Sequence, residues 1–131
     1  MRRMVLASMV LVACGGGRSS DGSAADTGTT VESVSERVDR LLSEQGDTET
    51  GAEVYASGCA SCHDANGYGG IGPMLVGTYL ELDDVLTTVI AGQGDMPPAG
   101  LDDGDLVDLM AHLEADVLYE DLCRSAAYRC D

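Results

Sequence analysis

Two cysteines and a histidine within five positions form the most reactive group of side chains in this chain. Cys59 and Cys62 are separated by two residues, and His63 follows directly, in the sequence CASCH. A helical turn with this spacing presents both sulfurs to one edge of a porphyrin, so that each thiol can add to a haem vinyl group. The imidazole that follows then lies under the iron and can bind it. The pentapeptide therefore predicts one covalently attached haem c, with His63 as an iron ligand.

A redox dithiol and half of a zinc site are the competing interpretations of these cysteines. A thioredoxin-like motif is expected within a pattern of alternating strands and helices, and this sequence has no strand-rich segment. A zinc site needs a second pair of ligands at suitable spacing, whereas Cys123 and Cys130 are distant and six residues separate them. Haem attachment is therefore favoured.

A glycine-rich stretch, GYGGIG, follows the pentapeptide over residues 67–72. It formally matches the pattern G-x-G-x-x-G, but it lacks the preceding strand of a dinucleotide-binding unit. Glycines let the backbone pass close to a porphyrin edge and turn without a steric penalty. An iron-bound histidine also needs an acceptor for its second ring nitrogen, and we expect a carbonyl of this loop to supply it.

The sixth position of the iron has five candidate ligands: Met74, Met96, Met110, His112 and water. Met110 falls in a helical apolar stripe and is expected in the core, and Met74 is tied to the glycine loop on the His63 side. Met96 lies in GQGDMPPAG, where two prolines stiffen the loop directly after it. A stiff loop presents a weak thioether ligand with little entropy to lose, so Met96 is the expected ligand. A plain interhelical loop is the alternative.

Two segments together resemble class I monohaem c-type cytochromes, namely GAEVYASGCASCHDANGYGGIGPML and the downstream GDMPPAGLDDGDLVDLMAHL. The likeness covers residues 51–116. It implies an all-α fold, a small cytochrome c-like helical bundle around one haem, in which a helix at about 51–58 crosses a C-terminal helix. It further implies that Pro73 gives its carbonyl to His63 and that Met96 is the distal ligand.

His112 departs from the pattern of that family. The C-terminal helix of the family usually carries an aromatic residue here, so the contact with Tyr55 at the helix crossing takes a modified form. A haem with His63 and His112 as its two ligands is the alternative, but a mid-helix position rarely reaches the iron. We expect His112 to pack between helices.

Apolar residues at helical intervals predict the elements that must position these groups. One helix is expected over 82–90, closed by Gly92. Another is expected over 102–119, with Asp102 as its cap. A short amphipathic helix is also predicted between residues 31 and 45, and we expect it to pack loosely on the domain or to fray.

The composition fits a small acidic protein that depends on a cofactor. The chain has 131 residues, no Trp, no Phe and no Lys, and a formal charge of −16. A small core this poor in aromatic residues usually needs additional stabilisation, for example from a large cofactor. The acidic charge argues against nucleic acid as a partner and favours redox proteins with basic docking surfaces.

The N-terminus predicts an exported lipoprotein anchored to a membrane, facing the periplasm or the cell exterior. Two arginines precede the apolar run MVLASMVLVA, which is too short to span a bilayer as a permanent helix, and LVAC resembles a lipoprotein box. We therefore predict a signal peptide over 1–13, a lipid on Cys14, and a flexible linker with one short helix over 14–50. An ordinary signal peptide, or a free thiol at Cys14, is the alternative.

The haem domain is expected over 51–120, and a tail over 121–131 holds the last two cysteines. Cys123 and Cys130 would lie about 10 Å apart on a continuous helix, too far for a disulfide. If the chain turns back between them, we expect a disulfide, because exported proteins fold in an oxidising compartment. Two free thiols are the alternative.

The expected function is one-electron transfer. A haem ligated by both histidine and methionine has no open position for a small-molecule substrate, and no side chain is placed as a general acid or base. Two alternatives remain. One is a haem peroxidase or gas sensor with Met96 displaced, and the other is a subunit that delivers electrons only within a fixed respiratory or dehydrogenase complex.

Overall fold

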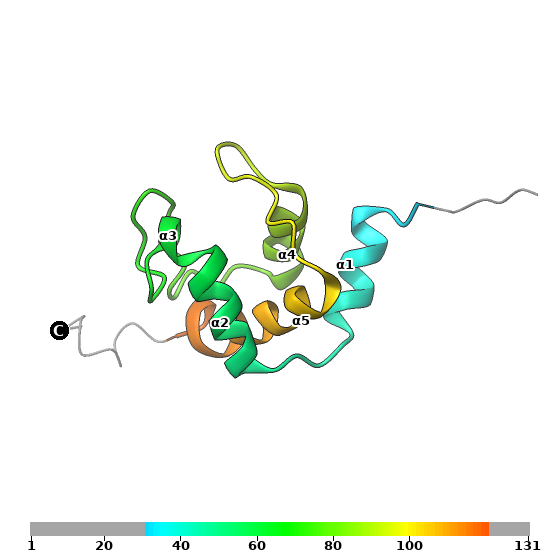
Figure 1. Cartoon of the computed structure of the whole chain (residues 1–131), viewed down its shortest axis with the longest axis horizontal. Helices are drawn as coiled ribbons and strands as arrows, with labels where there is room; N and C mark the ends of the chain where they lie inside the picture. The colour runs from blue at the N-terminus through cyan, green and yellow to red at the C-terminus, as the bar shows by residue number, and fades with distance from the viewer. Residues whose placement is uncertain (1–30, 121–131) are drawn as a thin grey trace, which may run out of the picture. The chain divides into compact units, whose positions relative to one another are not determined.

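The computed structural model describes residues 31–120 of the chain (Figure 1). The helical segments are α1 (Val34–Leu42), α2 (Thr48–Gly58), α3 (Ala60–His63), α4 (Leu82–Ala91), α5 (Asp103–His112) and the π-helix η1 (Leu113–Leu118). Over this range there is no strand, only an isolated bridge between Gln93 and Met96. The predicted all-α class is therefore confirmed. Cys14, Cys123 and Cys130, with the predictions made for them, lie outside the described residues.

The crossing of α2 and α5 is the centre of the fold. α2 begins at Thr48, three residues before its predicted start, because the Asp47 side chain accepts a hydrogen bond from the Thr50 backbone N–H at 2.7 Å and caps the helix. Gly51 allows the two helices to approach closely, because a Cβ there would overlap the Asp108 carbonyl. Without a side chain at the crossing, α2 packs closely against α5.

Tyr55 and His112 complete the crossing, as the sequence predicts. Their ring centroids lie 5.6 Å apart with the planes tilted by 57°. His112 Nδ1 lies 3.1 Å from the Asp116 carboxylate one turn later. The imidazole therefore packs between helices, in place of the aromatic ring that the resemblance implies for this position.

The helices predicted over 82–90 and 102–119 are both present, with small differences at their ends. α4 ends at Ala91, where Gly92 adopts φ +76°, a conformation that favours glycine. The Asp102 side chain accepts a hydrogen bond from the Asp105 backbone N–H at 2.9 Å, which caps α5. α5 then continues as η1 and ends at Leu118, close to the predicted end.

The helix α1 is held more firmly than we expected. Its Val38 and Leu41 side chains are 3% and 2% exposed, and α1 packs against α4 and α5. Arg37 and Arg40 both bind the Asp103 carboxylate, at 2.6 and 2.8 Å, at the start of α5. The expectation of loose packing or fraying is wrong, because burial of two apolar side chains and a shared ion pair tie α1 to the bundle.

The core of the domain is almost entirely aliphatic. Buried with Tyr55 are Val38, Leu41, Val76, Leu86, Val89, Leu106, Val107, Leu109, Met110, Leu113, Val117 and Leu118. The core position predicted for Met110 is confirmed. His63, at 7% exposure, is the one polar residue that is buried in the described part of the chain. No helix within residues 31–120 has the length and apolar character needed to cross a bilayer.

Candidate haem site

An open cavity of about 820 Å³ lies between α3, the loop that follows it, α4 and the loop that follows α4. Its volume falls in the range of sites for cofactors and other small molecules. Aliphatic side chains form much of the wall, among them Ile71, Leu75, Leu80, Val85, Val89, Leu109 and Leu113. All five residues predicted to bind haem, Cys59, Cys62, His63, Pro73 and Met96, also line it.

Cys59 and Cys62 reach the cavity because the chain continues from α2 into one further helical turn. The Cys62 backbone N–H donates to the Cys59 carbonyl at 3.1 Å, and the Cys59 N–H donates to the Tyr55 carbonyl at 2.8 Å. Cys59 is half-buried and Cys62 is exposed. Burial, and then the neighbouring Cys62, raises the pKa of the Cys59 thiol.

The His63 ring is fixed by contacts on two sides. Its Nδ1 lies 2.9 Å from the Pro73 carbonyl. Because a carbonyl can only accept, Nδ1 carries the ring proton and donates it, which leaves the Nε2 lone pair for a metal. A Cβ on Gly72 would lie 2.8 Å from the ring carbon Cε1 and 2.9 Å from Nδ1. Glycine at this position therefore makes room for the imidazole.

The turn after His63 is held by a tyrosine hydroxyl. Asp64 adopts φ +71°, an uncommon conformation for a residue other than glycine. Its carbonyl accepts hydrogen bonds from the Tyr55 hydroxyl at 2.9 Å and from the Gly67 backbone N–H at 3.1 Å. Burial, followed by the charges of Cys59 and Asp64, raises the pKa of Tyr55 to about 12. The hydroxyl therefore stays a donor, a role that the sequence analysis did not predict.

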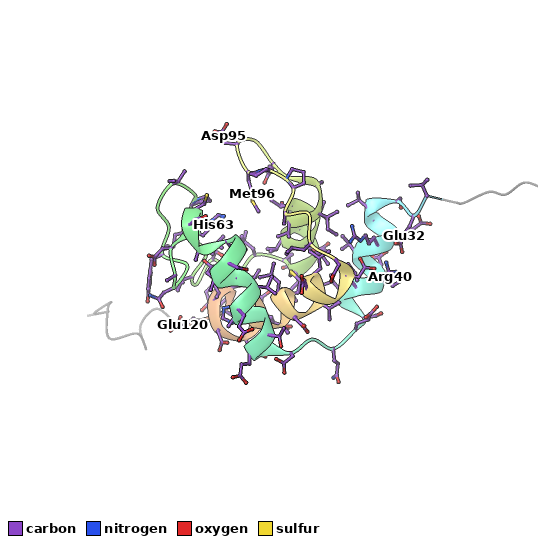
Figure 2. The ribbon with its side chains drawn as sticks, in the orientation of Figure 1. Glu32, Arg40, His63, Asp95, Met96 and Glu120 are labelled. Atoms are coloured by element: carbon purple, nitrogen blue, oxygen red, sulfur yellow. The ribbon has the colours of Figure 1, made fainter. Side chains whose placement is uncertain are left out.

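Met96 reaches the cavity on a short hairpin after α4. Gln93 and Met96 exchange two backbone hydrogen bonds, both of 2.9 Å. A Cβ on Gly92 would lie 2.8 Å from the Met96 carbonyl oxygen and from Pro98 Cδ. The half-buried Met96 side chain points from this hairpin toward the side of the cavity that holds His63 (Figure 2).

The charged side chains that line the cavity are carboxylates. Asp84 and Asp95 line the cavity, and both are exposed to solvent. The sequence has no Lys or Arg between residues 41 and 120, and Arg37 and Arg40 on α1 bind Asp103. The mouth of the cavity therefore lies in a negative electrostatic potential.

The residues around the cavity fit a haem c. Two thiols one helical turn apart, an imidazole with a free Nε2 and a thioether meet in one largely aliphatic pocket. Histidine with methionine is the axial ligand pair of cytochromes c. Fold and cavity together define a monohaem c-type cytochrome.

Comparison with known families agrees with this class. Residues 46–113 match the family described as "Cytochrome C oxidase, cbb3-type, subunit III", which is 68 of the 131 residues. The chain therefore belongs to this family of cytochromes c. It carries a covalently bound haem c and functions in electron transfer.

Two related proteins are described as the "Menaquinol:cytochrome c reductase cytochrome c subunit". The protein from Geobacillus thermodenitrificans is 45% identical over 53 residues, which is 37% of this chain and 21% of the relative. The protein from Bacillus subtilis (strain 168) is 38% identical over 61 residues, 43% of this chain and 24% of the relative. The chain therefore matches only about a fifth to a quarter of the length of these relatives.

Among solved structures, the chain matches that of cytochrome cL from Hyphomicrobium denitrificans. It is 26% identical in sequence, with a TM-score of 0.46. The match covers 51% of this chain and 45% of that one.

Proposed function

We propose that Cys59 and Cys62 hold the haem through two thioether bonds and that His63 and Met96 are its axial ligands. His63 would bind through Nε2, because its Nδ1 is bonded to the Pro73 carbonyl at 2.9 Å. Met96 would bind through its sulfur from the other side of the cavity. The placement of His63, at the end of α3, and Met96, in the loop after α4, on the same cavity is the observation that carries this assignment.

This arrangement suits a one-electron carrier. When bound, the haem supplies a one-electron redox couple, and a methionine ligand raises its potential. Backbone contacts hold both ligands: the Pro73 carbonyl holds the His63 ring, and two hydrogen bonds with Gln93 hold the Met96 backbone. Neither side chain needs to move between oxidation states, and no position is left for a small-molecule substrate.

The absorption spectrum of the holoprotein tests the Met96 assignment. Methionine ligation gives the oxidised protein a weak far-red band from sulfur-to-iron charge transfer. We expect this band in the purified protein and its loss in a Met96→Ala variant that retains covalent haem. A high-spin oxidised spectrum with rapid carbon monoxide binding in the unmodified protein would instead identify a peroxidase or gas sensor with an open distal side.

We also propose that a lipid on Cys14 anchors the domain to a membrane, facing the periplasm or the cell exterior. The proposal is supported by the sequence, in which a short apolar run after two arginines ends in LVAC. A Cys14→Ala variant tests it. We expect the holoprotein to move from the membrane fraction to the soluble fraction and to lose incorporation of a labelled fatty acid; a membrane-bound variant would contradict the anchor.

A second candidate is a subunit that passes electrons only within a fixed complex. The names of the two relatives, each a cytochrome c subunit of a menaquinol:cytochrome c reductase, favour it. Purification in mild detergent separates the two candidates. A stable assembly with quinol oxidation activity supports the fixed subunit, whereas a monomer that exchanges electrons with added redox proteins supports a mobile carrier.

A further inference from the structure

Exposed apolar side chains gather beside the haem cavity. Ile71, Tyr79, Leu80 and Tyr119 are 89%, 60%, 44% and 38% exposed, in a chain with five Tyr and no Trp or Phe. We call these four residues the Tyr79 surface. Aromatic side chains with large exposed area are typical of the centres of protein interfaces.

Direct contacts join Tyr79, Tyr119 and Leu80, and Ile71 lies on the wall of the same cavity as Leu80. The rings of Tyr79 and Tyr119 lie 5.9 Å apart with their planes tilted by 53°. The Tyr119 hydroxyl donates a hydrogen bond to the Leu80 carbonyl at 2.9 Å. Leu80 and Ile71 also line the haem cavity, so a protein bound to this surface lies against the wall of the cofactor site.

The backbone beneath this surface is tied down, although it is a loop. The Tyr79 N–H donates to the Leu118 carbonyl at 3.1 Å, and the Gly77 N–H donates to the Val117 carbonyl at 3.0 Å. Tyr79 is held at φ +52°, which is costly for an aromatic residue. A loop fixed in this way presents its exposed rings with little freedom left to lose on binding.

The charges near this surface determine what can bind it. Glu81, Asp83 and Asp84 lie within four residues after Leu80 and are exposed, and Glu120 follows Tyr119. No Lys or Arg occurs between residues 41 and 120. A second copy of the chain or an anionic membrane would therefore be repelled, whereas a basic protein surface would be attracted.

We propose that the Tyr79 surface is the docking site for a redox protein whose apolar contact area is surrounded by Lys or Arg. This proposal rests on the proposed electron-carrier function and names the surface through which that function is exercised. In the docked pair one electron would pass between the haem of this chain and the redox group of the partner, so that one is oxidised as the other is reduced, and no bond or proton would be transferred. Leu80 and Ile71 are the side chains that separate the partner from the cavity.

Electron exchange with two reagents tests the proposal. The protein reagent is a lysine-rich soluble cytochrome c, and the small reagent is the tris(phenanthroline)cobalt couple, each used in the direction that the potentials allow. The surface variants are Tyr79→Asn, because Asn tolerates a positive φ, and Tyr119→Ser; neither residue lines the cavity. Val34→Ser is the matched control, since Val34 is also exposed, at 40%, but lies on α1.

We expect each surface variant to lower the second-order rate constant with the protein reagent about tenfold at low ionic strength. The rate with the cobalt couple should stay within about twofold in every variant, and Val34→Ser should behave as the unmodified protein does. An unchanged rate with the protein reagent in both surface variants would overturn the proposal. An equal loss with the cobalt couple would also overturn it, because the effect would then lie in the haem site.

Two double variants, each of which removes two negative charges, provide a second test of the docking site. Glu81→Gln with Asp83→Asn should reduce the salt dependence of the rate, whereas Glu49→Gln with Glu53→Gln, the same charge change on α2, should reduce it less. Equal effects would contradict docking at this surface.

A dimer in sedimentation that dissociates in Tyr79→Asn would assign the surface to a second copy instead. Failure of the unmodified holoprotein to exchange electrons with the cobalt couple would refute the carrier function itself.

Discussion

The two sides of the haem cavity are built in different ways. On one side the His63 ring itself is fixed, by the Pro73 carbonyl at 2.9 Å and by close packing against Gly72, and Tyr55 holds the turn behind it. On the other side the hairpin fixes only the backbone of Met96, and its side chain is half-buried. The domain thus positions one proposed ligand through its ring and the other through its main chain.

The difference follows from the chemistry of the two ligands. An imidazole has two nitrogens, so its tautomer and its orientation must both be set before one nitrogen can bind a metal. A thioether has no proton to place and few orientations to exclude. A short hairpin that brings the Met96 backbone to the correct position is therefore sufficient. The His63 side should be more sensitive to substitution than the Met96 side.

The largest expected contrast is between His63→Ala and Met96→Ala. We expect His63→Ala to yield little or no covalent holoprotein, because the buried imidazole and its partners are lost together. Met96→Ala should retain covalent haem, lose the far-red band and lower the reduction potential, because a methionine ligand raises it. Mass spectrometry of the intact chain, visible spectra and a redox titration measure these outcomes. Equal holoprotein yields from the two variants would remove the contrast between the two sides.

Substitution of the two glycines compares the sides without removing a ligand. In Gly72→Ala the added methyl group meets the His63 ring, so we expect about 1–3 kcal/mol of destabilisation. In Gly92→Ala it meets the Met96 carbonyl and also forces Ala to φ +76°, with a cost of similar size. The difference should appear in the spectra, because only Gly92→Ala should weaken the far-red band.

Chemical denaturation gives the two free energies, and Gly58→Ala is the control, because a Cβ there meets nothing within 4 Å. A far-red band that survives in Gly92→Ala but is lost in Gly72→Ala would reverse the expected assignment of the two loops.

Much of this site was predictable because its chemistry depends on short spacings in the chain. The CASCH pentapeptide fixes two thiols and an imidazole within one turn, whatever surrounds them. Asp102 as a cap and Gly92 as a helix end were predicted for the same reason, since both signals act within a few residues. The proximity of Met96 to His63 was inferred from the resemblance and from its stiff loop, not from spacing alone.

The contacts that were missed join residues on separate elements. The Tyr55 hydroxyl reaches Asp64 only because α2 runs directly into α3, and no local pattern marks this bond. The packing of α1 was underestimated because Arg37 and Arg40 bind Asp103, which lies more than sixty residues later in the chain. Periodicity identified the helix but could not show that α4 and α5 would offer a surface for it.

Removal of the Tyr55 hydroxyl tests the support behind His63. We expect Tyr55→Phe to destabilise the holoprotein by about 1 kcal/mol, the usual value of one hydrogen bond, and to leave the Met96 far-red band unchanged. The pKa of Tyr55 is raised to about 12 by burial. Its neutral form is therefore favoured by folding, so this stability is complete below about pH 10, the ordinary tyrosine pKa, and is lost as the pH rises through about 12.

Stability measured from neutral to strongly alkaline pH checks both parts of this prediction. The unmodified protein should lose stability above about pH 10, and Tyr55→Phe should show a smaller loss over the same range. Tyr79→Phe is the matched control, because the Tyr79 ring is exposed. If the two variants have the same alkaline profile, the Tyr55 hydroxyl does not support the His63 side.

The smallest expected effect comes from α1, which packs against α4, the helix that leads into the Met96 hairpin. Hydrogen bonds from Arg37 and then Arg40 lower the pKa of Asp103. A carboxylate whose pKa is lowered by folding contributes stability above its ordinary pKa, about 4, and loses it as the pH falls through the folded value. Acid should therefore weaken the hold on α1, a partial release that loosens the Met96 side before the His63 side, while Val38 and Leu41 stay buried.

Asp103→Asn should reproduce this release at neutral pH, with a small loss of thermal stability, because exposed ion pairs contribute little. Asp83→Asn is the matched control, since Asp83 also lies in the first turn of its helix. The difference in melting temperature between the two variants should disappear as the pH falls through the lowered pKa of Asp103, because the Asp103 that remains in Asp83→Asn then becomes protonated as well. A difference that persists in acid would mean that Asp103 holds α1 through packing and not through its charge.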